Sequence, residues 1–327
     1  MYFAMNFREN LLIVLVYCCV LWAAQSAPTE KKGRIVGGTT AKPHSHPYLV
    51  SLQYRLLWIR AHFCGGALLN ENWVLSAGHC VDQPWYIRWI PVDLIAGIDD
   101  VDNFGPTAQI GTIAQKIPHP LYGGDIGPYD IAMIQMKAPF RLTKEVQPIN
   151  LPINNNLRSQ YQHLTVAGWG SLKTTAFIPD LPSRLQEVEV TYIPFDECYD
   201  AIDEVSSEGD EENPLDRVAH LCTGPLSGGI AACSGDSGGP LIQYISPSFE
   251  DTNATENPIA NEINVEENDF KTDEPNKILN TNVIDNRIPI VIGVVSWGIS
   301  PCGVKGAPTI YTNVSSYMNF INKYLYD

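Results

Sequence analysis

Short apolar runs separated by Gly, Pro and Asn make up most of the chain from Tyr48 onward. Between residues 186 and 192, Gln, Val, Val and Tyr alternate with Glu, Glu and Thr, which is the period of a strand with one buried face. Many short strands with frequent turns are typical of antiparallel barrels and sandwiches. The pattern therefore predicts an all-β protein, with strands at residues 48–54, 73–76, 93–96, 131–136, 164–169, 186–192 and 290–296.

Two segments depart from the strand pattern. Apolar residues near the C-terminus recur at helical spacing, which predicts a closing α-helix. Its apolar face consists of Tyr317, Phe320, Ile321, Tyr324 and Leu325. Residues 246–286 are rich in Asn, Asp, Glu and Thr without any period, and such a stretch buries too little apolar surface to offset its ordering entropy. Because it lies between two strand-like runs, we expect a disordered acidic insertion rather than a domain boundary.

An apolar run near the N-terminus has the features of a secretory signal. It covers residues 11–24, follows Arg8, and leads into small residues up to Ala27. Fourteen residues are too few to span a bilayer, which disfavours the alternative of a membrane anchor. We therefore predict a signal peptide at residues 1–27 and a soluble, secreted, extracellular mature protein. No later stretch of the sequence is long and apolar enough to span a membrane.

Cysteine usage fits an oxidising compartment. Removal of the signal takes away Cys18 and Cys19 and leaves six cysteines, an even number that indicates three disulfides. Spacing alone allows fifteen pairings. A zinc site is the weaker alternative, because no Cys-x-x-Cys pair or Cys/His cluster has the spacing of zinc ligands. The six residues are Cys64, Cys80, Cys198, Cys222, Cys233 and Cys302.

Composition and charge narrow the classes of partner. The chain has 327 residues, of which 45% are hydrophobic and 17% charged, and a formal net charge of −15. Such an acidic balance argues against nucleic acid or an anionic membrane as a partner. Residues 196–216 contain ten acidic and no basic residues, and residues 246–286 contain ten acidic residues and two lysines. We expect both acidic segments to be solvated loops.

The strongest candidate chemistry surrounds Ser237, in the sequence Gly-Asp-Ser-Gly-Gly-Pro at residues 235–240. A serine on a tight glycine turn exposes its hydroxyl, but it needs a base to become a nucleophile. His79, between small residues and a half-cystine, is the best candidate base. Asp130 precedes an apolar strand, where a carboxylate is costly unless it is paired. Each of these features alone is more often structural, but together and in the order His, Asp, Ser they indicate a catalytic triad.

These motifs resemble the chymotrypsin/trypsin family of serine endopeptidases. The similarity runs from Ile35 to the C-terminus apart from loop insertions. Besides the His79, Asp130 and Ser237 motifs, it includes Ile-Val-Gly-Gly at residues 35–38, Cys-Gly-Gly at 64–66, Gly-Trp-Gly at 168–170 and Ser-Trp-Gly at 296–298.

The resemblance implies a fold and a set of roles. The expected fold is two perpendicular six-stranded antiparallel β-barrels with a C-terminal α-helix, at residues 35–152 and 153–327 of a catalytic domain. Ser237 would attack the peptide carbonyl, His79 would transfer the proton, Asp130 would fix the imidazole, and the N–H groups of Gly235 and Ser237 would form the oxyanion hole. Tyr129 replaces the family's usual Asn, with little expected effect. The implied disulfides are Cys64–Cys80, Cys198–Cys222 and Cys233–Cys302.

The start of the domain resembles a zymogen junction. Residues 28–34 would be an activation propeptide, cleaved after Arg34, so that the free amine of Ile35 pairs with a buried Asp236. The alternative is a basic linker that is clipped without consequence. The propeptide contains no cysteine, so it should be released.

Specificity is expected to favour an uncharged P1 residue. The resemblance places Ala231 at the base of the S1 pocket, where trypsin-like members carry Asp. It places Thr309 at the back wall, where its side chain should shorten the pocket. The six pocket residues implied by the resemblance are Ala231, Ala232, Ser296, Trp297, Gly298 and Thr309. An enzyme whose S1 pocket lacks an acidic residue should cleave poorly after Arg34, so we expect a separate trypsin-like activating protease.

Other features leave alternatives open. A loop after Cys80 contains Trp85, Tyr86 and Trp89, which would either overhang the cleft or pack back onto the barrel. Acidic residues at 99, 100 and 102 suggest calcium, but Ile98 replaces the family's first acidic ligand, so we expect no metal. Asn253 and Asn313 begin glycosylation sequons.

The sequence thus predicts a secreted serine endopeptidase. It should act as a monomer without a cofactor on protein or peptide substrates, and be subject to protein protease inhibitors. The alternative is a catalytically silent homologue that acts as a binding or regulatory protein, but loss of a triad residue would mark such a protein and none is lost.

Overall fold

The computed structural model describes residues 37–124, 126–152, 164–171, 181–206, 212–245 and 287–326. The predicted signal peptide, the propeptide junction at Arg34 and Ile35, the insertion at residues 246–286 and the sequon at Asn253 lie outside the described residues. Within the described part of the chain, no helix combines the length and the apolar character that crossing a bilayer requires.

The first half of the described chain forms a closed antiparallel barrel. Its strands are β2 (Leu49–Leu56), β3 (Ile59–Asn70), β4 (Trp73–Ser76), β5 (Val92–Ala96), β6 (Gln109–Pro118) and β7 (Ala132–Met136). They pair in the order β2-β3-β4-β7-β6-β5, and β5 returns to β2 to close the barrel. Leu94, Met133 and Ile134 on these strands are fully buried, and since Met133 and Ile134 point to opposite faces of β7, that strand is covered on both faces.

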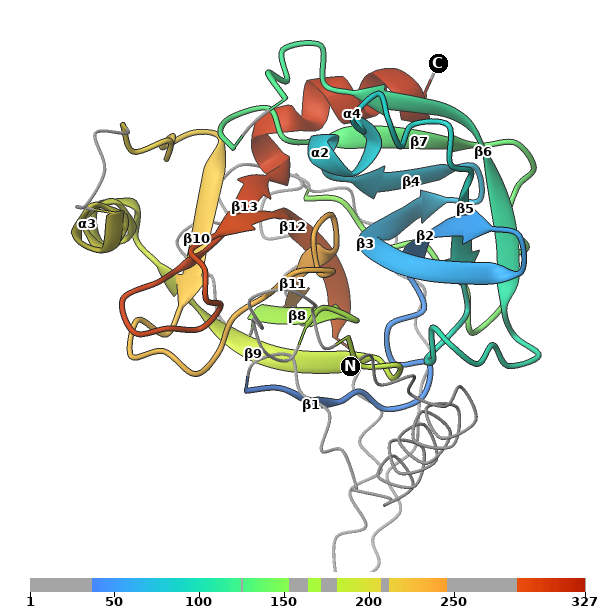
Figure 1. The fold of residues 1–327 in the computed structure, drawn as a ribbon, viewed down its shortest axis with the longest axis horizontal. Coiled ribbons are helices and arrows are strands. Elements are labelled where there is room, and N and C mark those ends of the chain that lie inside the picture. The colour runs from blue at the N-terminus through green and yellow to red at the C-terminus, as the bar shows by residue number, and fades with distance from the viewer. Residues whose placement is uncertain are drawn as a thin grey trace, which may run out of the picture. The chain divides into compact units, whose positions relative to one another are not determined.

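A second closed barrel follows. Its strands are β8 (Leu164–Gly168), β9 (Gln186–Ile193), β10 (His220–Gly224), β11 (Pro240–Ile245), β12 (Ile288–Gly298) and β13 (Thr309–Asn313). The order is β9-β10-β13-β12-β11-β8, with pairing of β8 and β9 closing the sheet and the short β1 (Thr39–Thr40) added outside β9. Figure 1 shows the first barrel in blue and green and the second in yellow to red. The predicted all-β fold of two six-stranded antiparallel barrels is confirmed.

The chain ends on the first barrel rather than on the second. The 3-10 helix η3 (Val314–Tyr317) leads into helix α4 (Met318–Leu325), as the apolar spacing predicts. Phe320 and Ile321 are buried in the same hydrophobic core as the strands of the first barrel, and the ring of Tyr324 packs on Trp73 at 5.6 Å. The C-terminal helix therefore ties the end of the second barrel to the first.

The acidic segment at residues 196–216 is not simply a solvated loop, and that expectation was wrong. Residues 195–206 form helix α3 (Phe195–Ser206). Cys198 and Ile202 on its inner face are buried together with Cys222 of β10, while the acidic residues face outward. The helical spacing of the apolar residues, three and four positions apart, therefore determines the structure of residues 195–206 despite the high negative charge of the segment.

Candidate functional site

His79 and Asp130 come together on the first barrel. His79 lies in the single-turn helix α2 (Gly78–Val81), directly after β4, and Asp130 lies just before β7, the neighbour of β4 in the sheet. The Nδ1 atom of His79 lies 2.9 Å from Oδ2 of Asp130, and the backbone N–H of His79 donates to Oδ1 at 2.9 Å. This double contact fixes the ring and leaves Nε2 as the nitrogen that can exchange a proton with a substrate or nucleophile.

Asp130 also accepts hydrogen bonds from two hydroxyl groups of the second barrel. Ser296 donates to its Oδ2 at 2.5 Å, and Thr312 donates to its backbone carbonyl at 2.6 Å. Burial alone would raise the pKa of the Asp130 carboxyl. The hydrogen bond and charge of His79, with the hydroxyl of Ser296, outweigh burial and hold that pKa below its usual value. Asp130 is therefore an ionised carboxylate that can stabilise an imidazolium.

Ser237 reaches the same place from the second barrel. Its backbone carbonyl accepts a hydrogen bond from the N–H of Gly65 at 2.7 Å. The next residue, Gly238, has φ +77°, and a Cβ there would lie 2.3 Å from Oγ of Ser76 and 3.1 Å from Sγ of Cys80. Only glycine permits this approach of the serine turn to the segment that carries His79. Among the described residues, no hydrogen bond joins the Ser237 hydroxyl to His79.

The backbone around Ser237 offers two N–H donors. Within the described ranges, the N–H groups of Gly235 and Ser237 have no protein acceptor. The carbonyl of Gly235, by contrast, is bound by Nε2 of His62 at 2.9 Å, and Nδ1 of His62 lies 2.8 Å from Oγ of Ser51. Burial lowers the pKa of His62 to about 4, so this ring is neutral and acts as a fixed support. This contact fixes the peptide between Gly235 and Asp236, which lies between the two N–H donors that would form the oxyanion hole.

Asp236 is a buried carboxylate whose ligands are backbone N–H groups. Its Oδ1 accepts from Gly170 at 2.8 Å and its Oδ2 from Cys233 at 2.9 Å. A Cβ on Gly170 would lie 2.2 Å from Oδ2, so the glycine makes room for the acid. Burial raises the pKa of Asp236 to about 6 despite these donors. In the described part of the chain, no cation lies within ion-pair distance of it.

A cavity of about 170 Å³ opens beside Ser237. Its walls are strand β12 with the loop after it, the start of β13, and the segment before Ser237. All six pocket residues expected from the sequence line it: Ala231, Ala232, Ser296, Trp297, Gly298 and Thr309. Its described lining includes no charged side chain, so the cavity suits an uncharged group.

The described chain contains three disulfides, of which Cys64–Cys80 and Cys233–Cys302 adjoin the site. They are Cys64–Cys80, Cys198–Cys222 and Cys233–Cys302, the pairings that the resemblance implies. Cys64, His79 and Cys80 bring three candidate metal-ligand atoms within 4.8 Å of one another. The two sulfurs are bonded to each other and offer no thiolate, so this donor set does not fit a zinc site. The cluster is instead a histidine packed beside a disulfide.

Asn313 is not a credible glycosylation site, and that prediction was wrong. The residue ends the central strand β13 and is 1% exposed. Its Nδ2 donates to the carbonyl of Val218 at 3.0 Å and to the hydroxyl of Ser316 at 2.9 Å. A glycan on this nitrogen would break both hydrogen bonds and has no room in the interior.

Sequence reasoning missed the supporting role of three residues. His62 lies only two residues before the Cys-Gly-Gly motif, yet its contact to Gly235 spans 173 positions and leaves no local pattern. Ser296, expected in the pocket, also holds Asp130. Tyr129 has φ +71°, a conformation that the family's Asn adopts more readily, and it is held by the hydroxyl of Tyr317, which accepts from its N–H at 2.9 Å.

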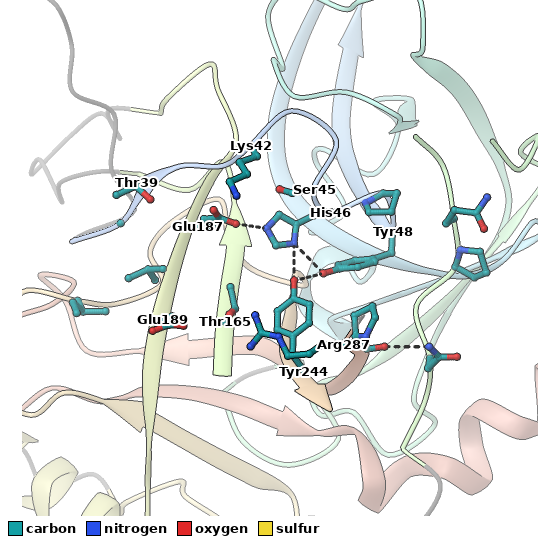
Figure 2. Close-up of a pocket in the computed structure, with 18 of the residues that line it drawn as sticks. Thr39, Lys42, Ser45, His46, Tyr48, Thr165, Glu187, Glu189, Tyr244 and Arg287 are labelled. Carbon is teal, nitrogen blue, oxygen red and sulfur yellow. Dashed lines mark hydrogen bonds and ion pairs between the residues drawn. The ribbon is translucent and has the colours of Figure 1, made fainter. Parts of the chain in front are cut away.

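A larger cavity, of about 900 Å³, contains none of the three predicted catalytic residues. Figure 2 shows His46 at its wall between Glu187 and two tyrosines. Nε2 of His46 lies 2.7 Å from Glu187, and Nδ1 lies 2.9 Å from the hydroxyl of Tyr48. Burial, followed by the nearby Tyr244 and Glu187, raises the pKa of Tyr48 well above its usual value, so this phenol is a poor nucleophile. The cavity therefore does not compete with the Ser237 site for the catalytic role.

Comparison with known proteins agrees with the geometry. The family model described as Trypsin matches residues 35–244 and 279–321. The chain is 32% identical to granzyme-like protein 1 of Rattus norvegicus over 71% of this chain and 84% of that protein. It is 30% identical to lectizyme of Glossina austeni over 91% of this chain and 89% of that protein. With kallikrein-1 of Mus musculus, identity is 27% over 95% of this chain and 97% of that protein.

Proposed function

This chain belongs to the trypsin family of serine peptidases, and on that premise we propose that it is a secreted endopeptidase that uses His79, Asp130 and Ser237. The observation that carries the proposal is the network in which Asp130 holds His79 through two hydrogen bonds beside the turn of Ser237. A carboxylate, an imidazole and a half-buried serine that borders a cavity form, in this order, a general-base system for acyl transfer.

The proposed reaction has two halves. Ser237 Oγ attacks the carbonyl carbon of the scissile peptide while Nε2 of His79 takes the hydroxyl proton, and the carbonyl oxygen becomes an oxyanion held by the N–H groups of Gly235 and Ser237. His79 then gives the proton to the leaving amine, which frees an acyl-enzyme. Water repeats the sequence and releases the acid. The hydrogen bond between Ser237 and His79 forms in the substrate complex, since such contacts often tighten only on binding.

Covalent labelling tests the nucleophile. Processed protein should be labelled by a fluorophosphonate on Ser237, and Ser237→Ala should abolish labelling and reduce kcat by about 10⁵-fold or more. Ser234→Ala is the matched control, because Ser234 is an exposed serine in the same cavity, and it should keep both labelling and activity. Unlabelled, inactive processed protein would instead support the silent-homologue alternative.

Activation is the second part of the proposal. Cleavage after Arg34 would create an ammonium at Ile35 that pairs with Asp236, a buried carboxylate without a cation among its described neighbours. The pair would hold the turn at Gly235 and Ser237 in its binding conformation. N-terminal sequencing of active, secreted enzyme should give Ile35 as the first residue, after removal of residues 1–27 and 28–34, and any other start contradicts the assignment.

The pocket supports a preference for uncharged P1 residues. Ala231 at its base carries a methyl group, and the buried Thr309 narrows its back. A cationic P1 side chain would lose its hydration there without gaining a counter-ion. A peptide library should show faster cleavage after Leu, Met, Phe, Tyr or small aliphatic residues than after Arg or Lys. The same pocket makes self-cleavage after Arg34 slow, so a trypsin-like protease should be needed for activation.

A further inference from the structure

Two turns of the first barrel expose a concentration of large apolar side chains. We call them together the aromatic tip surface. It consists of the turn between β2 and β3 and the loop after α2, with Leu56, Leu57, Trp58, Ile59, Trp85, Tyr86 and Trp89. Leu57 and Trp58 are 83% and 82% exposed, and Trp85 and Trp89 are 74% and 69% exposed. The aromatic residues of the loop therefore do not pack back onto the barrel, which was one of the two alternatives that the sequence left open.

The two turns are neighbours in space. Arg55 at the end of β2 donates its N–H to the carbonyl of Pro91 at 2.8 Å, and Tyr54 pairs with Val92 in the ladder between β2 and β5. The loop is also internally ordered, because the indole N–H of Trp89 donates to the carbonyl of Tyr86 at 2.7 Å. The apolar side chains are thus presented by a defined scaffold.

The backbone at the hairpin tip is unfavourable for the residues it carries. Leu56 pairs with Ile59, so Leu57 and Trp58 form a two-residue turn. Leu57 has φ +56°, in the left-handed region, and a turn with such a residue at its first central position favours glycine there. The backbone of Leu57 is strained and its side chain is exposed to solvent, so neither folding stability nor solubility explains a leucine at this position. A binding role for the exposed side chains explains it.

Charge identifies the kind of partner. Residues 53–63 and 83–92 contain Arg55, Arg60 and Arg88 and no acidic residue. Nearby Asp93 is buried and forms ion pairs with both Arg55 and Arg60. Surfaces that bind at the boundary between lipid headgroups and acyl chains are typically rich in Trp and Tyr beside Leu and Ile, with arginines around them. The aromatic tip surface has this composition. The residues of the tip line neither of the two described cavities.

We propose that the aromatic tip surface binds a lipid bilayer with anionic headgroups. Leu57 and Trp58 enter the headgroup boundary, the loop with Trp85 and Trp89 lies along it, and the exposed Arg88, which has no ion pair among the described residues, faces the phosphates. The net charge of the chain argued against this partner, but the local balance is different: Arg55, Arg60 and Arg88 outnumber Asp82 and the buried Asp93 at the two turns. The proposal does not depend on the proposed peptidase activity.

The test uses the full mature chain with Ser237→Ala, to prevent autolysis, and sedimentation with vesicles. The protein should bind phosphatidylcholine vesicles that contain phosphatidylserine, and bind less to phosphatidylcholine alone and at high salt. The variant Leu57→Gly/Trp58→Ser supplies the residues that the turn favours, so it should melt at the same or a higher temperature while it binds at least about tenfold more weakly. Val218→Ser, which removes an apolar side chain that is 63% exposed elsewhere, should bind like the parent.

Five outcomes would overturn the proposal. The first is a parent protein that sediments with neither vesicle, and the second is an unchanged affinity in the turn variant. The third is a parent that dimerises through this surface without binding vesicles, which would make a second copy the partner. The fourth, measured with the processed chain that keeps Ser237, is a turn variant that changes only the cleavage of folded protein substrates, which would assign the surface to substrate binding. Equal binding to both vesicle types would overturn the headgroup assignment.

Discussion

On the proposed function, Ala231 is the residue whose side chain would most directly determine which substrate fits the cavity beside Ser237. It is 5% exposed at the base of an uncharged pocket. Ala231→Asp should place a carboxylate where a P1 Arg or Lys ends and raise kcat/KM for P1-Arg relative to P1-Leu by about 100-fold. Ala231→Asn has the same size without the charge, so it should not gain cleavage after Arg. Equal gains in both variants would show that pocket size, not charge, governs the preference.

Asp236 gives a pH test of activation. In the uncleaved chain its pKa is raised from 3.8 to about 6, so its contribution to stability is present below pH 3.8 and is lost as pH rises through 6. That loss corresponds to roughly 3 kcal/mol. A new ammonium would lower the same pKa and reverse the sign. The difference in Tm between cleaved and uncleaved protein should therefore grow from pH 4 to pH 7.

Other titrating groups do not obscure this comparison. His62, whose lowered pKa makes it destabilising under acid, contributes equally to both forms and cancels in the difference. Calorimetry of the two forms at several pH values measures the effect. A difference in Tm that stays constant between pH 4 and pH 7 would contradict the pairing of Ile35 with Asp236.

At the scale of single elements, η3 supports the loop that carries Asp130. Tyr317 accepts the N–H of Tyr129, which is held in a left-handed conformation next to Asp130. Tyr317→Phe leaves that N–H without an acceptor and should cost about 1–3 kcal/mol of folding free energy and lower kcat. Tyr324→Phe in α4 is the matched control, because its hydroxyl makes no hydrogen bond among the described residues. Equal effects of the two changes on Tm and kcat would contradict this role.

The elements predictable from sequence were those with a clear period or apolar run. The strands expected at 73–76, 93–96 and 186–192 agree with β4, β5 and β9 to within a residue or two. Strand β3 was missed because Cys-Gly-Gly in its centre has the composition of a turn, and its glycines are needed for close packing: a Cβ on Gly66 would lie 2.7 Å from Val74. Strand β11 was missed because it begins at Pro240, directly after Gly-Gly.

The candidate residues of the site, the pairing of His79 with Asp130 and the disulfides were predictable, but the contacts that support them across the two barrels were not. Motifs and chain order located His79, Asp130 and Ser237, because each has a local signature. The hydrogen bond from Ser296 to Asp130 spans 166 positions, and that from His62 to Gly235 spans 173. Such pairs depend on how two closed barrels meet, which no local pattern of apolar and polar residues contains.

The whole molecule is organised around the seam where the turn of Ser237 meets β3 and β4. Gly238→Ala puts a methyl group 2.3 Å from Ser76 and 2.6 Å from the carbonyl of Gly65, at φ +77°. The change should destabilise the protein by about 3 kcal/mol or more and abolish activity. Gly229→Ala is the control, since Gly229 has φ +86° with no atom within 4 Å and should lose only about 1 kcal/mol. Equal losses would contradict the packing of this seam.

The disulfide between Cys64 and Cys80 connects the segment that carries His79, the proposed base, with the strand that contacts the turn of Ser237, the proposed nucleophile. Cys80 adjoins His79, while Cys64 adjoins Gly65, whose N–H holds the carbonyl of Ser237. One covalent link thus joins the supports of both reacting groups. If the chain is the secreted peptidase proposed above, a molecule left in the reducing cytosol would lose that link, and the proposed alignment of His79 with Ser237 would lose a covalent support.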